Sequence, residues 1–345
     1  MANDTYITPS VFGCNGEDYI WLSTGRSAIS FVLGTIEERN PDIHKIALLP
    51  SFTCNTVIEP FIRAGYTVYT LPISERLCTS ANDVLLAQKE TGASVVLIHR
   101  YYGFDTLSGT KDISKTLSEQ GAVLIEDITQ CLYSNLCPIG ADYLVGSIRK
   151  WTGVPDGGFA TCKTGHFRNK PVKQDNELQN AKRDASVLKY RYIYENAGIK
   201  QDFIDKYRMA EELLDNQKEY YTIGQLSMQI LGSLDANMLK TKRRNNYKKL
   251  AAGLSEFPDI KLVFAELSDN VTPLYCPIYV EKRAELQIYL GQQSIYAPIV
   301  WPKAGIISTI CSQAEVLYNN LLCLPIDQRY DESDINRVVK AIKAK

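Results

Sequence analysis

The chain has 345 residues, of which 45% are hydrophobic and 22% are charged, and its formal net charge at pH 7 is −1. This length favours two domains over one small core, and the near-neutral charge gives no reason to expect nucleic acid or an anionic membrane as the main partner. The sequence contains no apolar run long enough to span a bilayer, and residues 1–5 lack the basic start and apolar core of a signal peptide. We therefore expect a cytoplasmic protein.

Cysteine and histidine are scattered along the chain. The nine cysteines form no C-x-x-C pair, and the three histidines, His44, His99 and His166, do not have metal-ligand spacing. These patterns predict reduced thiols and no metal site.

The first half of the chain alternates between short apolar runs and helical segments. This alternation predicts a mainly parallel sheet with helices on both faces. The expected strands are residues 19–22, 45–49, 66–70, 94–99 and 122–125, and the expected helices are residues 23–33 and 56–62, with a helical segment before each of the last two strands.

The second half changes character. Residues 167–221 are rich in Lys, Asp, Glu, Asn and Tyr, which predicts long and mostly exposed helices with loops. Beyond residues 223–234, which are more apolar, comes a helix with a basic cluster that we interpret as a solvated face. The cluster comprises Lys240, Lys242, Arg243 and Arg244.

A second, smaller α/β unit is expected from about residue 249. Its expected strands are residues 260–263 and 272–280, and its last helix, residues 332–344, is amphipathic. The stripe of that helix comprises Ile335, Val338, Val339 and Ile342. We therefore predict an N-terminal arm over residues 1–20, a large three-layer α/β/α domain over residues 21–248 and a small C-terminal domain over residues 249–345.

Residues 142–160 form the most informative stretch. A short apolar strand leads to a turn rich in glycine and proline, and a second strand leaves through Gly157 and Gly158. Lys150 lies at the start of the turn. If it is held between two buried strands, desolvation disfavours its ammonium form and leaves a nucleophilic amine. The alternative is an ordinary surface lysine in a turn.

Gly25, Arg26 and Ser27 lie where a strand-like segment enters a helix. Free backbone N–H groups and the helix dipole make such a start an anion site, and Gly25 allows close approach. The alternative is that Ser23 or Thr24 merely caps the helix.

Glu126 and Asp127 end a buried strand, at the edge of an open α/β sheet where ligands bind. A buried carboxylate needs a cationic or hydrogen-bonding partner, and a protonated pyridine nitrogen would supply one. The alternative is an ordinary loop carboxylate. A phosphate cradle, an acid for a ring nitrogen and an imine-forming lysine, in this chain order, are the parts of a pyridoxal phosphate site.

The chain also resembles the DegT/DnrJ-like sugar-nucleotide aminotransferases, which are fold-type-I pyridoxal-phosphate enzymes. The resemblance covers most of the chain and rests on an ordered set of short motifs. These are Gly25-Arg26-Ser27-Ala28, Pro50-Ser51-Phe52-Thr53, Tyr102-Gly103, Glu126-Asp127-Ile128-Thr129-Gln130, Lys150 with Asp156-Gly157-Gly158, and Leu324-Pro325-Ile326.

The resemblance implies an aspartate-aminotransferase-like fold in which residues 21–248 bind the cofactor. It implies that Lys150 holds pyridoxal 5'-phosphate as a Schiff base and then acts as a general base. It also implies that Asp127 binds the pyridine nitrogen and that Gln130 packs near the ring. The other expected cofactor contacts are Gly25, Arg26, Ser27, Cys54 and Ser147.

The sequence departs from the family pattern at several positions. Cys54 stands where the family often has an aromatic residue stacked on the cofactor. Val145 replaces the usual phosphate-binding serine. Two interpretations of Ser147 stay open: it binds the phosphate from a shortened loop, or it has no such role. Arg100 stands where the family has histidine. The Gly-Phe-Asn-Tyr-Arg stretch that reaches across the family dimer is not recognisable, and its nearest counterpart is residues 220–223.

The implied activity is transfer of an amino group from glutamate to a keto-sugar nucleotide, in cell-surface polysaccharide or secondary-metabolite sugar synthesis. The alternatives are another pyridoxal-phosphate reaction, on an amino acid or small ketone, and a non-catalytic cofactor-binding scaffold. We also expect a homodimer with active sites at its interface. The tyrosines of residues 167–221 have the aromatic content of an interface, although a solvated helical insertion explains the segment equally well.

Overall fold

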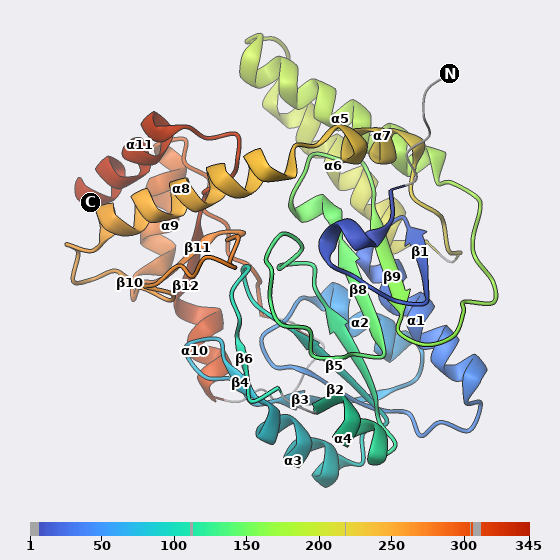
Figure 1. Ribbon diagram of the computed structural model, residues 1–345. Coiled ribbons are helices and arrows are strands. Elements are labelled where there is room, and N and C mark those ends of the chain that lie inside the picture. The colour runs from blue at the N-terminus through green and yellow to red at the C-terminus, as the bar shows by residue number, and fades with distance from the viewer. Residues whose placement is uncertain (1–6, 111–112, 218, 304, 306–311) are drawn as a thin grey trace. The chain divides into compact units, whose positions relative to one another are not determined.

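The computed structural model describes residues 7–110, 113–217, 219–303, 305 and 312–345 (Figure 1). Its central element is a seven-stranded sheet. The strand order is β1 (Asp18–Leu22), β9 (Gly158–Cys162), β8 (Tyr143–Ser147), β7 (Val123–Asp127), β5 (Val95–His99), β2 (Ile46–Pro50) and β3 (Thr67–Leu71).

Most of this sheet is parallel. Strand β2 pairs in parallel with β3 and with β5, and β5 pairs in parallel with β7. Strand β9 runs antiparallel to both β1 and β8. All five residues of β5 are buried, as expected for a strand with both faces covered. The predicted α/β class and mainly parallel sheet are confirmed.

The chain divides into two compact units, each assembled from separate stretches. The first contains residues 1–39 and 143–234, and the second contains residues 40–142 and 235–345. The domain boundaries that the sequence predicts, after residues 20 and 248, stay predictions.

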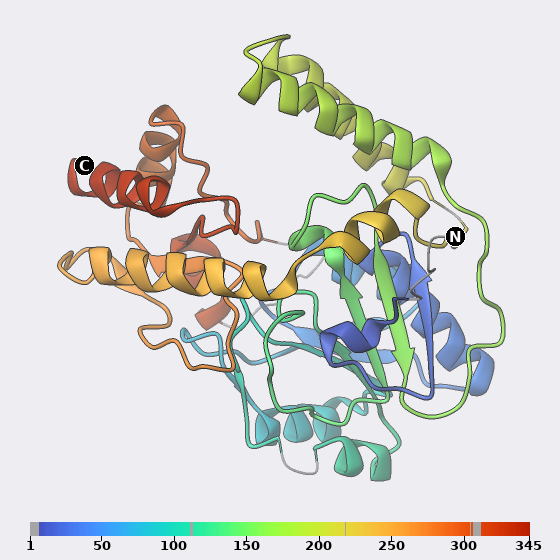
Figure 2. The same cartoon turned by 45° about the horizontal axis from the view of Figure 1, so that its top comes forward.

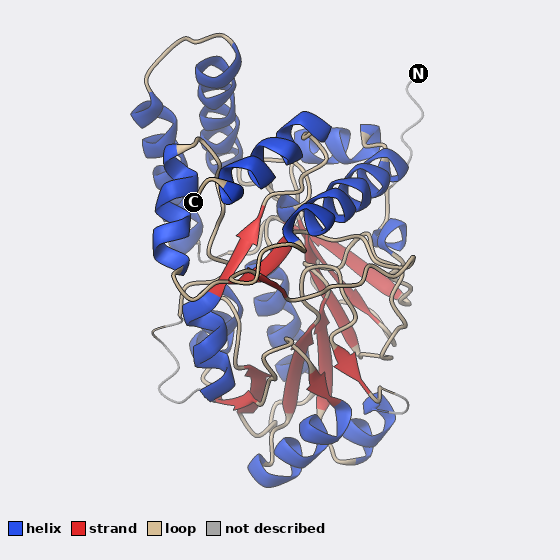
Figure 3. Cartoon of the chain, turned by 90° about the vertical axis from the view of Figure 1, so that its left-hand side faces the viewer, coloured by secondary structure: helices blue, strands red, loops and turns tan. Residues whose placement is uncertain are grey.

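The first unit contains strands β1, β8 and β9. Helix α1 packs on β8 and β9 through an apolar face that includes Ala28, Ile29 and Val32. Helices α5 and α6 form a hairpin whose residues are mostly exposed, as predicted (Figures 2 and 3). The helices of this unit are α1 (Gly25–Arg39), α5 (Asn176–Tyr194), α6 (Lys200–Asp215) and α7 (Gln225–Ser233), with 3-10 turns η1 (Pro9–Phe12) and η2 (Ile148–Lys150).

The second unit contains the parallel strands β7, β5, β2 and β3 together with two smaller sheets. The strands of the smaller sheets are β4 (Thr79–Ser80) and β6 (Leu107–Ser108), and β10 (Lys261–Leu262), β11 (Cys276–Tyr279) and β12 (Leu321–Leu324). The helices are α2 (Asn55–Arg63), α3 (Ala81–Thr91), α4 (Ile113–Glu119), α8 (Ala236–Leu254), α9 (Arg283–Gln292), α10 (Ser312–Asn320) and α11 (Glu332–Lys343). The stripe predicted for the last helix is confirmed, since Ile335, Val338 and Ile342 enter the core.

The basic cluster of α8 is not wholly a solvated face. Arg243 is only 2% exposed, its Nη1 donates to the Leu274 carbonyl at 2.8 Å, and its Nε donates to Gln328 Oε1 at 2.8 Å. Arg243 lies one turn after Leu239 and one turn before Tyr247, on the buried stripe of the helix. The prediction is wrong for Arg243 because its helical position carries it inward, where fixed acceptors satisfy the guanidinium donors.

Among the described residues, no helix has the length and apolar character needed to cross a membrane.

Candidate active site

Lys150 lies at the end of η2, directly after β8. The strand–turn–strand arrangement predicted for residues 142–160 is confirmed. However, Lys150 is exposed, and Trp151, which follows it, is the buried residue. The prediction that the strands desolvate the lysine is therefore wrong for this chain. The reason is that the turn carries Lys150 past the strand end and turns the indole inward in its place.

Two glycines fix the exit from this turn. A Cβ on Gly158 would lie 2.2 Å from the backbone carbonyl of Thr24, so only glycine allows β9 to approach so closely. Gly157 has φ +133, a conformation that glycine adopts most readily, and its N–H donates to the Ser23 carbonyl at 2.6 Å. The lysine turn is thereby tied to the segment that leads into α1.

The predicted phosphate turn begins helix α1 at Gly25. The Thr24 hydroxyl accepts from the Ser27 N–H at 3.0 Å, so Thr24 caps the helix. A Cβ on Gly25 would lie 3.1 Å from the Cβ of Ser147, which brings the end of β8 next to the helix start. The structure thus places Gly25, Ser27 and Ser147 in one region, and their role toward a phosphate stays a prediction.

Arg26 points to helix α6. Its Nη1 lies 2.7 Å from Asp215 Oδ1, and its side chain is 18% exposed. The sequence did not anticipate this pairing because it joins residues far apart in the chain. The predicted contact of Arg26 with a cofactor stays a prediction.

A second ionic cluster lies beside the lysine turn. Glu211 of α6 accepts from Arg149 at 3.3 Å and also pairs with Lys182 of α5, which is 5% exposed. Burial lowers the pKa of Lys182, and the positive charges of Arg149 and Lys150 lower it further, while Glu211 opposes them. The sequence signal for this cluster was weak, because only the folded hairpin brings α5 and α6 to the turn.

Asp156 anchors the same turn on helix α7. Its carboxylate is fully buried and accepts from the Gly224 N–H at 3.0 Å and from the Ser227 hydroxyl at 2.5 Å. Burial raises the pKa of Asp156, and these hydrogen bonds oppose the rise. The carboxylate also complements the positive end of the α7 dipole. The sequence analysis noted Asp156 only as part of a motif.

In the second unit, Asp127 is the last residue of β7 and is only 7% exposed. Its Oδ1 accepts from the Thr129 N–H at 2.9 Å. Its neighbour across the parallel ladder is His99, whose ring is also buried. Burial lowers the pKa of His99, and the Asp127 carboxylate opposes that shift. The predicted position of Asp127, at the carboxyl end of a buried strand, is confirmed.

Glu126, beside it, belongs to a buried ion pair. Arg100 donates through Nε at 3.0 Å and through Nη2 at 2.5 Å to the same oxygen, Glu126 Oε1, and Arg100 Nη1 also donates to the Cys137 carbonyl at 3.0 Å. Burial raises the pKa of Glu126, and Arg100 opposes the rise. Arg100, a departure from the family pattern, thus holds the ends of β5 and β7 together.

Gln130 holds the next turn in place. Its Oε1 accepts from the Tyr102 N–H at 2.7 Å, and Tyr102 has φ +55, in the left-handed region. Gly103 follows with φ +96, and a Cβ there would lie 2.1 Å from the Thr272 carbonyl oxygen. The predicted packing of Gln130 near a cofactor ring stays a prediction.

Cys54 precedes the first residue of α2 and is partly exposed, with the Thr56 hydroxyl 3.1 Å from its Sγ. Aromatic rings gather nearby around His99 rather than at Cys54. The His99 and Trp301 ring centroids lie 5.4 Å apart, and Phe52 lies 5.5 Å from Trp301. The sequence could not reveal Trp301, because it lies some two hundred residues from His99 along the chain.

Within the described part of the chain, no group of three or more His, Cys, Asp and Glu side chains could hold a metal ion. The described cysteines are free thiols, and Cys311 lies outside the described residues.

Solved structures provide the comparison. TlmJ of Streptoalloteichus hindustanus, an aminotransferase, is 16% identical with a TM-score of 0.69 over 97% of this chain and 87% of its own. PseC of Helicobacter pylori, an aminotransferase of pseudoaminic acid biosynthesis, is 14% identical with a TM-score of 0.68 over 97% and 88%. The PLP (pyridoxal phosphate) form of Spr1654 of Streptococcus pneumoniae, assigned as a sugar aminotransferase, is 13% identical with a TM-score of 0.67 over 97% and 88%.

The chain has the fold of the sugar aminotransferases. At these identities the likeness shows the fold. No protein-family profile matches the sequence, and no curated protein matches it either. The fold-type-I architecture that the resemblance implied is therefore confirmed by structure where sequence comparison finds nothing.

Proposed function

We propose that this protein is a PLP-dependent aminotransferase. The observation that carries the proposal is the position of Asp127, a buried carboxylate at the carboxyl end of a parallel strand within this fold. A buried carboxylate is stable only beside a cation or hydrogen-bond donors. The ring nitrogen of PLP, when protonated, is such a cation, and the PLP form of Spr1654 is among the structures with this fold.

The residues present fit the cofactor. Gly25 leaves the start of α1 bare, and the hydroxyls of Ser27 and Ser147 lie in the same region, as a phosphate group requires. Lys150 is exposed, so its amine is accessible to a carbonyl carbon. Cys54 supplies no ring for stacking, which sets this chain apart from the family pattern.

When bound, PLP supplies a carbonyl carbon that condenses with amines and a ring that accepts electrons. Lys150 would hold the cofactor through Nζ and, once released, would move the proton at the substrate Cα as a general base. Asp127 would keep the proton on the ring nitrogen. The N–H groups at the start of α1, with Arg26, Ser27 and Ser147, would bind the phosphate. Gln130 would pack near the ring.

For the substrates we propose glutamate as the amino donor and a keto-sugar nucleotide as the acceptor. The sugar aminotransferases of this fold support the choice, PseC among them. Another PLP reaction on an amino acid or small ketone is the second candidate, because the family's Gly-Phe-Asn-Tyr-Arg stretch is not recognisable in this sequence. A cofactor-binding scaffold without activity is the third.

We also propose a homodimer that works in the cytoplasm. The tyrosines of α5 support an interface, since Tyr190, Tyr192 and Tyr194 are all exposed. A reducing compartment is consistent with the free thiols.

Absorbance spectroscopy on the purified protein with PLP tests the proposal. We expect a visible absorbance band from the bound cofactor, covalent labelling of Lys150 after borohydride reduction, and loss of the band on adding glutamate. Lys163→Ala, at another exposed lysine of the first unit, is the control. Labelling of a different lysine would refute the site. A stable band that changes with neither glutamate nor any other amino acid would instead support the cofactor-binding scaffold without activity.

A further inference from the structure

Lys150 is exposed, so burial in its turn does not remove the charge of its amine. A lysine amine also becomes nucleophilic when other cations lie beside it, because they disfavour its ammonium form. The first unit brings two such cations to the turn. Arg149 directly precedes Lys150, and Lys182 comes from helix α5.

Arg149 and Lys182 share one carboxylate oxygen. The Nη2 of Arg149 lies 3.3 Å from Glu211 Oε1, and the Nζ of Lys182 contacts the same Oε1. The Lys182 side chain is 6% exposed and that of Arg149 is 24% exposed, so water and salt screen these charges less than those of a surface pair. One carboxylate of α6 therefore holds two cations beside the lysine turn.

The hairpin core holds Lys182 in this place. Lys182 directly follows Ala181 of α5. Glu211 directly follows Ala210 of α6, and both alanines belong to the buried apolar cluster that joins the two helices. Tyr207 lies one turn before Glu211 on the same face of α6, and its ring centroid is 5.6 Å from the Lys182 Nζ. Packing from both helices thus fixes the position of the ammonium group.

The charges at the lysine turn balance when the Lys150 amine is uncharged. The second carboxylate is that of Asp156, which accepts hydrogen bonds from helix α7. Lys150, Arg149 and Lys182 are three cations against the two carboxylates of Glu211 and Asp156, and loss of the Lys150 proton makes the numbers equal. Burial raises the pKa of Asp156, and a protonated Asp156 would leave the turn more positive still. The neighbouring pair of Arg26 and Asp215 is balanced by itself.

Lys150 and Lys182 also repel each other. Burial is the main cause of the lowered pKa of Lys182, and the charges of Arg149 and Lys150 lower it further. Coulomb repulsion is mutual, so the charge of Lys182 acts on the Lys150 amine in the same sense.

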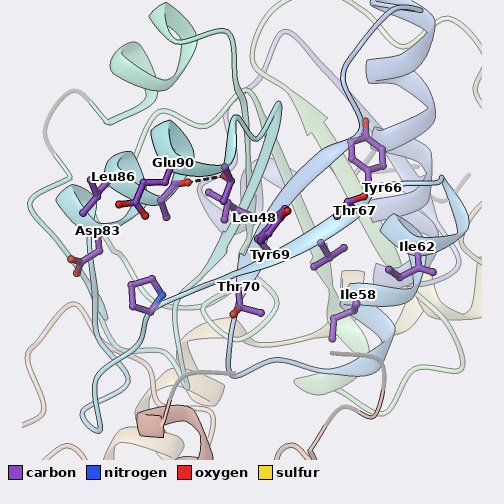
Figure 4. Close-up of a pocket in the computed structure, with 14 residues that line it drawn as sticks. Leu48, Ile58, Ile62, Tyr66, Thr67, Tyr69, Thr70, Asp83, Leu86 and Glu90 are labelled. Carbon is purple, nitrogen blue, oxygen red and sulfur yellow. Dashed lines mark hydrogen bonds between the residues drawn. The ribbon is translucent and has the colours of Figure 1, made fainter. Parts of the chain in front are cut away.

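An open groove in the second unit has the opposite charge. It lies between helices α2 and α3, and its volume is about 690 Å³ (Figure 4). Among the described residues that line it, the charged ones are Asp83 and Glu90, both acidic. Carboxylates stabilise an ammonium group, so this groove would not favour an uncharged amine. At the lysine turn, cations outnumber carboxylates as long as Lys150 keeps its proton.

We propose that Lys182, held by Glu211, is a positioning residue that favours the uncharged, nucleophilic form of the Lys150 amine. Arg149 acts in the same direction from within the turn. The proton leaves to solvent, and the lone pair on Lys150 Nζ becomes available to a carbonyl carbon. This inference rests on the proposed function, because it concerns how the same lysine becomes a nucleophile.

The pH profile of Lys150 acylation in the protein without PLP tests the inference. A trace of acetic anhydride labels uncharged amines, and mass spectrometry of the Lys150 peptide over a pH series gives the midpoint. Lys182→Met should raise this midpoint by at least about half a pH unit. Lys182→Arg keeps the charge and should leave the midpoint unchanged. Lys189→Met removes a charge from the same helix about two turns away and is the matched control.

A second variant separates the effect of charge from loosening of the hairpin. Lys182→Met with Glu211→Gln removes one charge of each sign and should return the midpoint toward that of the parent. Lost packing alone would shift the double variant at least as far as the single one. Thermal melts check that each variant folds.

An unchanged midpoint in Lys182→Met, an equal rise in Lys182→Arg or in the control, or a double variant shifted as far as Lys182→Met would overturn the inference. Borohydride labelling of Lys150 with PLP is measured on the same proteins. A label on Lys150 without the shift refutes this role of Lys182 alone. The shift without a label in any protein refutes the proposed function and leaves the charge effect on Lys150.

Discussion

The end of β8 and the end of β7 each present one of the proposed catalytic groups, but they differ in burial. Lys150, after β8, is exposed and stands on a short 3-10 turn. Asp127, at the end of β7, is 7% exposed and lies beside the buried His99. One group is accessible to a reacting carbon, whereas the other is held where a charge is costly without a partner.

The supports of the two groups differ in the same way. Around Lys150 the backbone of the turn is fixed by Gly157 and Gly158 and by the hydrogen bonds of Asp156 to helix α7. Around Asp127 the support is a buried ion pair between Arg100 and Glu126. A nucleophile must move between bonded and free states, and a charged anchor must stay fixed. The contrast therefore suits a mobile lysine and a rigid acid.

The contrast between Lys150 and Asp127 has no meaning for catalysis if Lys150 is dispensable. Lys150→Ala should abolish borohydride labelling and lower transamination by about 10⁴-fold, because both the covalent link and the general base disappear. Single-turnover assays with glutamate measure the loss, and Lys163→Ala should match the parent. Activity within about tenfold of the parent would contradict the assignment.

The buried support around Asp127 can be tested by removing Arg100. Arg100→Met leaves Glu126 buried without its cation and should cost about 3–5 kcal/mol of unfolding free energy. Denaturant titrations measure it.

The same variant has a predicted pH dependence. The pKa of Glu126 is already raised by burial, so its contribution to stability is present below the unfolded pKa and is lost as the pH rises through the folded pKa. Removing Arg100 raises this pKa further, so the loss should be greater at about pH 8 than at about pH 5. In Arg100→Met with Glu126→Gln the extra loss at high pH should vanish. An equal cost at both pH values would show that Glu126 is not the buried charge concerned.

Asp127→Asn tests the proposed role of the buried carboxylate. We expect proton abstraction to slow by on the order of 10²- to 10³-fold while cofactor binding weakens only modestly, because the carboxylate acts mainly on the ring nitrogen. Stopped-flow spectra with glutamate separate the two effects. Glu119→Gln, an exposed carboxylate of the same unit, is the control. Turnover equal to that of the parent would place Asp127 outside the site.

Thr24→Ala gives the smallest expected effect. It removes the acceptor for the Ser27 N–H and should cost about 1 kcal/mol of unfolding free energy, as loss of a helix cap does. Ser80→Ala, at the cap of α3, is the comparable change in the second unit. If Thr24→Ala costs nothing while Ser80→Ala does, the α1 start is held by its other contacts.

The sequence by itself determined the local framework. Short apolar runs bounded by glycine and proline placed β2, β5, β7 and β8 to within a few residues, because a buried strand has little latitude in composition. The motif around Asp127 also gave its position at a strand end. The fold was predictable from the order of such motifs, although the sequence is only 13–17% identical to the solved sugar aminotransferase structures compared with it.

Only the tertiary structure decided where several charged side chains go. Arg243 looked like part of a solvated cluster, yet it is buried among carbonyl oxygens of distant segments. Arg26 forms an ion pair with Asp215, and Lys182 forms one with Glu211, because the α5–α6 hairpin folds back on its own unit. Trp301 reaches His99 in the same manner. Long charged and aromatic side chains take partners by proximity in space, and sequence spacing carries little information about contacts across some two hundred residues.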